Sequence, residues 1–192
     1  YIITLTNKER ILAMNYIKVR AHGKINLALD VLRKREDGYH DVRMVMQTVM
    51  LYDDVTLEKK EEEGIELETN LSFLPVDSGN IAYKAAKLLI DEFKIPGGIK
   101  IRLEKHIPVA AGMAGGSTNA AAVLYGMNKM YNLGLTTEEL MERGVKLGAD
   151  VPYCIMRGTV LAEGIGEILT PLAPLPKCYV LIAKPPLSAS TK

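Results

Sequence analysis

The sequence predicts an α+β domain in which helices pack on one face of a mixed or antiparallel sheet. Several predicted strands come first, and helices and strands then follow in an irregular order. A parallel, doubly wound sheet would instead show a regular alternation of strand and helix. The 192 residues suffice for one substantial core, or for one domain and part of another.

The N-terminal half is predicted to form strands and turns. Alternating residues rich in β-formers predict strands over 17–21, 25–32 and 44–50. Asp37-Gly38 marks a turn between the second and third of these strands. Asp53-Asp54 is expected to turn the chain again, and 55–58 and 64–69 are expected to pair as a hairpin around an acidic tip.

The C-terminal half is predicted to mix helices with short strands. Asn80 is a suitable N-cap for a helix whose apolar residues recur on one face, and Pro96-Gly97-Gly98 ends that helix. Thr136 and Glu139 form a capping box for a later helix. Further strands are expected over 99–105, 159–162, 168–169 and 180–183.

A segment of small residues follows the strand at 99–105 and opens a helix. Small side chains let backbone N–H groups approach an anion, and a helix N-terminus adds free donors and a positive dipole end. A tight turn with an N-cap serine would need only one glycine, so this composition favours phosphate binding. The candidate residues are Pro108, Val109, Ala110, Ala111, Gly112, Met113, Ala114, Gly115, Gly116, Ser117 and Thr118.

This segment matches neither of the common phosphate-binding loops. A Walker A loop needs a lysine before its Ser/Thr, and no lysine lies between Pro108 and Asn119. The three glycines of the segment also lack the Gly-x-Gly-x-x-Gly spacing of a dinucleotide-binding fold.

Composition excludes or disfavours several other classes of function. The net charge of +1 gives no support for a nucleic-acid or membrane partner, and no apolar run approaches the length of a membrane span. The histidines lack the spacing of a zinc site, so no metal-ligating residues are assigned. Cys154 and Cys178 have no CxxC spacing and are expected to be buried, reduced thiols of a cytosolic protein.

Three further places carry residues suited to chemistry. Taken alone, Lys24 is an exposed turn lysine, Asp150 is a capping aspartate before a proline, and Tyr39-His40 is a surface pair beside a turn. Together with a phosphate loop they suggest phosphoryl transfer. A buried aspartate can direct the proton of an acceptor hydroxyl, and a lysine can offset the charge that develops.

These segments resemble the GHMP kinase superfamily, which includes galactokinase, homoserine kinase and mevalonate kinase. The matching segments, in family order, are Lys24–Leu27, Arg35–His40, Ser78–Ile81, Pro108–Ala121, Gly148–Pro152 and Gly164–Glu167. Tyr39-His40 after Asp-Gly is the discriminating feature. With this feature the chain is similar to the branch of the superfamily that phosphorylates 4-diphosphocytidyl-2-C-methyl-D-erythritol in non-mevalonate isoprenoid biosynthesis.

The resemblance implies ATP-dependent phosphorylation of the 2-hydroxyl of that compound. Asp150 would be the general base, and Lys24 would hold the aspartate and lower the cost of the alkoxide. Asn26 would contact the methylerythritol unit. Tyr39 and His40 would bind the cytosine. Homoserine or mevalonate kinase activity, and a truncated nucleotide-binding module without turnover, stay open as alternatives.

The resemblance also implies the nucleotide half of the site. The small-residue loop would wrap the phosphates of ATP, with Mg²⁺ between them, while Asn80 and Lys105 would line the nucleotide pocket. Ala110, Ala111 and Ala114 replace glycines of many relatives, and any of them would be strained at a positive φ.

The resemblance implies an N-terminal domain like the second domain of ribosomal protein S5, followed by a ferredoxin-like domain that is largely missing here. The expected division is a tag, extended start or short native arm over 1–13, an ATP-binding domain over 14–176, and the start of a truncated C-terminal domain over 177–192.

Overall fold

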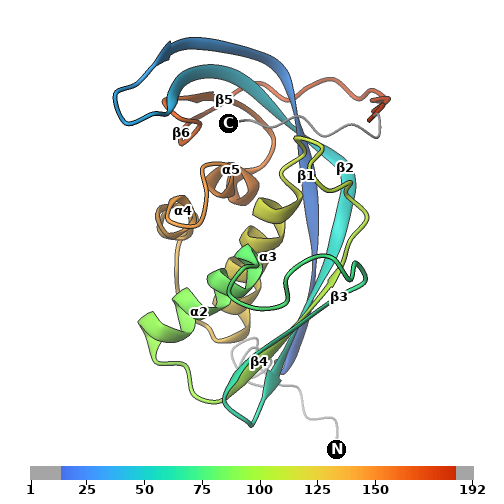
Figure 1. The fold of residues 1–192 in the computed structure, drawn as a ribbon, viewed down its shortest axis with the longest axis vertical. Coiled ribbons are helices and arrows are strands. Elements are labelled where there is room, and N and C mark those ends of the chain that lie inside the picture. The colour runs from blue at the N-terminus through green and yellow to red at the C-terminus, as the bar shows by residue number, and fades with distance from the viewer. Residues whose placement is uncertain (1–13, 185–192) are drawn as a thin grey trace, which may run out of the picture.

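The computed structural model describes residues 14–184 and shows one six-stranded sheet with helices along one of its faces (Figure 1). The predicted α+β fold class is therefore confirmed. The predicted segment 1–13, and residues 185–192 of the predicted segment 177–192, lie outside the described residues.

Two long antiparallel strands form the frame of the sheet. β1 (Tyr16–Lys34) and β2 (His40–Lys60) pair along their length, with irregularities in register that include one between His22 and Lys24. β2 runs straight through Asp53-Asp54, so the expected turn there is wrong. Neighbouring strand residues face opposite sides of a sheet, which places Asp53 inside and leaves Asp54 on the outer face.

β2 divides its second edge between two partners. β1 lies along one edge, while 44–47 pair with β5 (Thr159–Glu163) and 54–60 pair with β4 (Gly98–Glu104) on the other. β6 (Ile168–Pro171) extends the sheet beyond β5. Between the two paired segments, the small-residue loop approaches β2, because Val49 packs against Ile107 and Met113.

The expected hairpin between 55–58 and 64–69 is wrong. β3 (Gly64–Thr69) pairs in parallel with β4, which lies between β2 and β3. β4 supplies Ile99 and Ile101, both fully buried, and such a strand belongs inside the sheet. The connection from β2 passes so close to β4 that a Cβ on Gly98 would lie 2.2 Å from the carbonyl oxygen of Glu62.

The central helix α3 (Gly115–Met130) packs between the sheet and the other helices and is buried along most of its length (Figure 1). α3 approaches the sheet closely, since a Cβ on Gly126 would lie 2.5 Å from Leu57 Cδ1. The remaining helices are α2 (Ile81–Phe93), α4 (Thr137–Val145) and α5 (Val151–Met156).

The predicted helix caps are confirmed. The Asn80 side chain accepts a hydrogen bond from Ala82 N, and Thr136 and Glu139 form the reciprocal capping box of α4. α5 was not predicted, because Pro152 suggested only a break. Proline is tolerated in the first turn of a helix, where its missing N–H has no helical partner.

The strand expected over 180–183 is wrong. The described chain has no regular structure from 172 to 184, where Pro174 and Pro176 remove backbone donors that a strand would need. Apolar side chains in this stretch are exposed, including Tyr179 and Leu181.

The loop before α3 contains two alanines in the left-handed region. Ala110 and Ala114 both have φ of 54°, and Ala114 is the N-cap residue of α3. No side-chain hydrogen bond caps this end of the helix. The strain expected from alanine at a glycine position is therefore present at two of the three positions, and Ala111 is not among the residues with positive φ.

Replacing Ala114 by glycine should raise the free energy of unfolding by up to about 1 kcal/mol, because glycine adopts a positive φ without a Cβ penalty. Ala122→Gly, inside α3, is the control and should lower it by about 1 kcal/mol. Urea unfolding followed by circular dichroism measures both. A similar loss in the two variants would contradict the assignment of strain.

Candidate active site

A cavity of about 570 Å³ brings together residues from distant parts of the chain. Its wall includes the small-residue loop, the start of α2, the bulged region of β1 and the start of α5. Predicted site residues that line it are Lys24, Asn26, Asn80, Lys105, Pro108, Val109, Ala110, Ala111, Gly112, Met113, Ala114, Gly115, Gly116 and Asp150.

The small-residue loop is fixed to β1 and to the core beneath it. Lys24 N donates a hydrogen bond of 3.1 Å to the carbonyl oxygen of Met113. The Met113 side chain is buried with Ile107 and Val49, which holds the middle of the loop against the sheet. The first N–H groups of α3 have no partner within the helix and are available at the cavity wall, as an anion site requires.

The two hydroxyl residues of the loop do not line this cavity. Thr118 is buried and donates its hydroxyl to the carbonyl oxygen of His22 at 2.7 Å, so it ties α3 to β1. Ser117 lies in the first turn of α3 and is half-buried.

Lys24 and Asp150 face each other in the cavity. The Lys24 Nζ lies 3.7 Å from Asp150 Oδ2 and donates to Asn26 Oδ1 at 3.1 Å. Lys24 is only 5% exposed, so it is not a surface turn lysine. The Asp150 side chain makes no capping hydrogen bond although the residue precedes α5, and its carboxylate remains directed to the lysine.

α5 is anchored so that Asp150 is held in place. The hydroxyl of buried Tyr153 donates to the carbonyl oxygen of Gly158 at 2.8 Å and lies 3.0 Å from Thr48 Oγ1 in β2. Burial raises the pKa of Tyr153 to about 12, so this hydroxyl keeps its proton.

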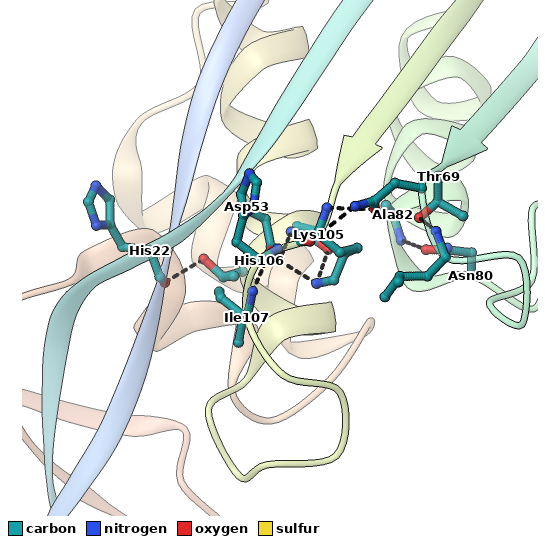
Figure 2. A network of polar contacts seen from close by, with 12 residues as sticks. His22, Asp53, Thr69, Asn80, Ala82, Lys105, His106 and Ile107 are labelled. Carbon is teal, nitrogen blue, oxygen red and sulfur yellow. Dashed lines mark hydrogen bonds and ion pairs between the residues drawn. The ribbon is translucent and has the colours of Figure 1, made fainter. Parts of the chain in front are cut away.

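A buried polar cluster centred on Asp53, a residue that was not predicted for the site, adjoins the cavity through Lys105 and Asn119 (Figure 2). Asp53 accepts hydrogen bonds from the backbone N–H groups of His106 and Ile107, at 2.7 and 2.8 Å. It also accepts from Asn119 Nδ2 at 2.9 Å and forms an ion pair with Lys105. A signal was present in the sequence, because Asp53 shares the inward register of β2 with Val55 and Leu57.

Lys105 and Asn80, the two residues predicted for the nucleotide pocket, both line the cavity. The backbone of Lys105 exchanges hydrogen bonds with the side chain of Asn70, which secures the end of β4. The side-chain oxygen of Asn80 accepts a hydrogen bond from Ala82 N, and its NH₂ group donates to the carbonyl oxygen of Pro75. Both polar groups of this side chain are therefore engaged at the start of α2.

The structure does not bring Tyr39 and His40 to this cavity. Both are exposed at the tip of the β1–β2 hairpin, where Tyr39 N donates to Asp37 Oδ1. The resemblance places them at the cytosine, and neither residue belongs to the cavity wall described above.

A group of metal-ligating side chains within the described chain lies on the outer face of the sheet, away from the cavity. Ligand atoms of Asp54, Glu104 and His106 all lie within 4.8 Å of one another. Lys18 Nζ already pairs with Asp54 Oδ2 at 2.9 Å, and both Glu104 and His106 are exposed. None of these three residues lines the cavity.

The two cysteines have different environments. Cys154 in α5 is buried, and burial followed by the charge of nearby Asp150 raises the pKa of its thiol to about 12. Cys178 is exposed, so the expectation that both thiols are buried is wrong for Cys178.

Among the described helices, none combines the length and the apolar character needed to cross a membrane.

Comparison with known proteins agrees with this architecture. Residues 80–158 match the family model for the GHMP kinases N terminal domain. The matched segment is similar to the N-terminal domain of GHMP kinases. The matched residues include α2, the small-residue loop, α3 and Asp150, and so cover most of the cavity wall.

Two relatives of the chain are bacterial proteins named 4-diphosphocytidyl-2-C-methyl-D-erythritol kinase. The protein of Lachnoclostridium phytofermentans is 59% identical and that of Lachnospira eligens 57% identical, each over 179 residues. These residues are 93% of this chain and 62% of each relative. The chain thus spans less than two thirds of the length of the curated relatives that it matches.

Solved structures show the same fold. A crystal structure of 4-(cytidine 5'-diphospho)-2C-methyl-D-erythritol kinase is 36% identical and matches with a TM-score of 0.71, over 82% of this chain and 55% of that one. The mevalonate kinase of Methanococcus jannaschii, at 16% identity, matches with a TM-score of 0.64 over 82% of this chain and 56% of its own. The second match shows the fold alone.

The two cysteines should differ sharply in alkylation at neutral pH. Iodoacetamide reacts with thiolates, so exposed Cys178 should label readily while buried, protonated Cys154 should stay unmodified until the protein unfolds. Mass spectrometry of peptides, with and without urea, measures both. Equal labelling of the two thiols in the folded protein would contradict the burial of α5.

Proposed function

We propose that the chain forms the ATP-binding part of a small-molecule kinase that phosphorylates the 2-hydroxyl of 4-diphosphocytidyl-2-C-methyl-D-erythritol. The observation that carries the proposal is the Lys24–Asp150 pair, which lies in the same cavity as the small-residue loop and the start of α3. A proton acceptor, a cation and an anion site in one cavity are parts that phosphoryl transfer to a hydroxyl uses.

In this proposal, Asp150 accepts the proton of the acceptor hydroxyl. The freed oxygen forms a bond to the γ-phosphorus of ATP as the bond between that phosphorus and the oxygen of the leaving ADP breaks. Lys24 has its ammonium 3.7 Å from Asp150 Oδ2, and there it orients the carboxylate and offsets the negative charge of the alkoxide. Asn26, which hydrogen-bonds Lys24, is assigned to the acceptor side of the cavity.

The loop over 108–118 is assigned to the phosphates of ATP, with Asn80 and Lys105 lining the nucleotide region. Mg²⁺ usually keeps several waters and binds through substrate phosphates and one or two carboxylates. Asp150 lines the same cavity but is assigned to the proton of the acceptor, so the magnesium ion would be held mainly by the nucleotide phosphates and by water. The ion would neutralise phosphate charge.

The acceptor is assigned from the names of the relatives and from the Tyr39-His40 segment. Cytosine binding by these residues requires the substrate to reach the exposed hairpin tip beyond the cavity wall.

Residues 14–176 are proposed as the ATP-binding domain, since the last described strand ends at Pro171. Residues 177–192 are proposed as the start of the next domain.

Release of ADP tests the catalytic assignment. With ATP, Mg²⁺ and the diphosphocytidyl substrate, Asp150→Asn should lower the rate by about 100-fold or more, because the proton acceptor is lost. Asp91→Asn, which changes an exposed carboxylate of α2, is the matched control and should keep the wild-type rate.

Homoserine and mevalonate serve as alternative acceptors in the same assay. Equal ADP release by wild type and Asp150→Asn would contradict the role of Asp150. Binding of ATP without ADP release from any acceptor would contradict kinase activity of this chain.

The cytosine assignment is tested by His40→Ala. This variant should raise KM for the diphosphocytidyl substrate by about tenfold and leave KM for ATP unchanged, because only the acceptor loses a contact. Glu36→Gln, at the same exposed hairpin tip, is the control. A rise in both KM values, or in neither, would count against cytosine recognition at this hairpin.

A further inference from the structure

Asp53 is a completely buried carboxylate with no role in the chemistry proposed above. Its Oδ1 accepts the N–H groups of His106 and Ile107, and its Oδ2 faces Lys105 Nζ and Asn119 Nδ2. The carboxylate thus joins β2 to the end of β4 and to the first turns of α3. All three elements meet at this carboxylate (Figure 2), and Lys105 and Asn119 also line the cavity.

The two oxygens of Asp53 serve different parts of the site. Oδ1 fixes the backbone where β4 leads into the small-residue loop. Oδ2, with Asn119 Oδ1 at 2.8 Å from the same ammonium, fixes the head group of Lys105. An ammonium has three donors, so two are engaged by Asp53 and Asn119 and one is left for the cavity that Lys105 lines.

Lys105 is held directly beneath the start of α3. A Cβ on Gly115, the first residue of α3, would lie 3.1 Å from the Lys105 Nζ. The ammonium and the free N–H groups of the helix are therefore adjacent, and both attract an anion at the same place.

Stability alone is a weak explanation for this arrangement. Burying two charges costs several kcal/mol per ion, and replacing such a pair by apolar residues is often neutral or stabilising. The geometry around Lys105 is better explained by a requirement for an ammonium at one fixed position.

We propose that Asp53 is a positioning residue, which holds the Lys105 ammonium under the N-terminus of α3 so that it contacts the phosphates of the bound nucleotide. The inference deepens the proposed function and rests on it. Asp53 itself touches neither nucleotide nor acceptor. Its effect on binding passes through Lys105.

The direction in which one substitution at Asp53 changes the affinity for ATP distinguishes positioning of Lys105 from a simple effect of charge. The negative charge of Asp53 repels phosphates, so removing it would tighten ATP binding if charge alone mattered. Loss of positioning has the opposite effect, because the ammonium leaves its place when its buried partner is gone.

Asp53→Asn is the informative variant, because the amide oxygen can still accept from the N–H groups of His106 and Ile107. Its NH₂ group then faces the donors of Lys105 and Asn119. The exchange Asp53→Asn/Asn119→Asp moves the carboxylate to the other partner of Lys105, so the ammonium keeps an ionised acceptor at position 119. The NH₂ group at position 53 then donates to that carboxylate in place of the contact that Asn119 Nδ2 made with Asp53. Asp54→Asn removes the same charge from the opposite face of the sheet and is the control.

Titration of the folded chain with MgATP in a calorimeter gives the result. Asp53→Asn should raise Kd by about tenfold, the exchange variant should return it to within about threefold of wild type, and Asp54→Asn should leave it unchanged. Circular dichroism and urea unfolding of every variant confirm that the measured protein is folded.

A double-mutant cycle keeps the proposal testable if Asp53→Asn fails to fold. Lys105→Met and Asp53→Asn/Lys105→Met contain no buried ammonium for Asp53 to position. The double variant should therefore bind MgATP at least as tightly as Lys105→Met, because only the repulsion by the Asp53 charge is removed. A further loss in the double variant would show that Asp53 acts by another route and would overturn the proposal.

Failure of this inference differs from failure of the proposed function. Wild type that binds MgATP, together with folded Asp53→Asn that binds it equally well or more tightly, overturns the role of Asp53 alone. Wild type that does not bind MgATP contradicts the proposed function and, with it, this inference.

Discussion

The site depends on one backbone hydrogen bond, from the N–H of Lys24 to the carbonyl oxygen of Met113. It joins the bulged part of β1 to the small-residue loop, which otherwise belongs to the β4–α3 connection. Because Lys24 also faces Asp150 at the start of α5, the same residue links the anion-binding wall to the acid–base pair. Segments more than 80 residues apart in the chain thereby line one cavity.

Local chemistry explains what the sequence predicted well. The caps at Asn80 and Thr136, and the opening of α3 by small residues, depend on neighbours within a few positions. Strand partners depend on distant segments, which is why the placement of β4 between β2 and β3 could not be predicted. Asp53 was taken for a turn residue since a charged side chain inside a strand needs partners that only the folded chain supplies.

The residues of the candidate site fall into the same two groups, those that could be predicted from the sequence and those whose contacts depend on the folded chain. Lys24, Asp150 and most of the small-residue loop could be predicted from residue type and family resemblance, and they meet in the cavity. Thr118 and Asn80 use their polar groups on the protein itself, so residue type alone overstated their availability. Tyr39 and His40 lie apart from the cavity at an exposed hairpin tip, and their role rests on the resemblance rather than on contact.

The left-handed alanines at 110 and 114 have a consequence for the entropy of ligand binding. Glycine at these positions would populate many backbone conformations, and a bound phosphate would have to select among them. Alanine narrows that choice while the chain folds, so less conformational freedom is lost when the ligand arrives. The loop exchanges a small loss of folding stability for a shape that is set before the nucleotide binds.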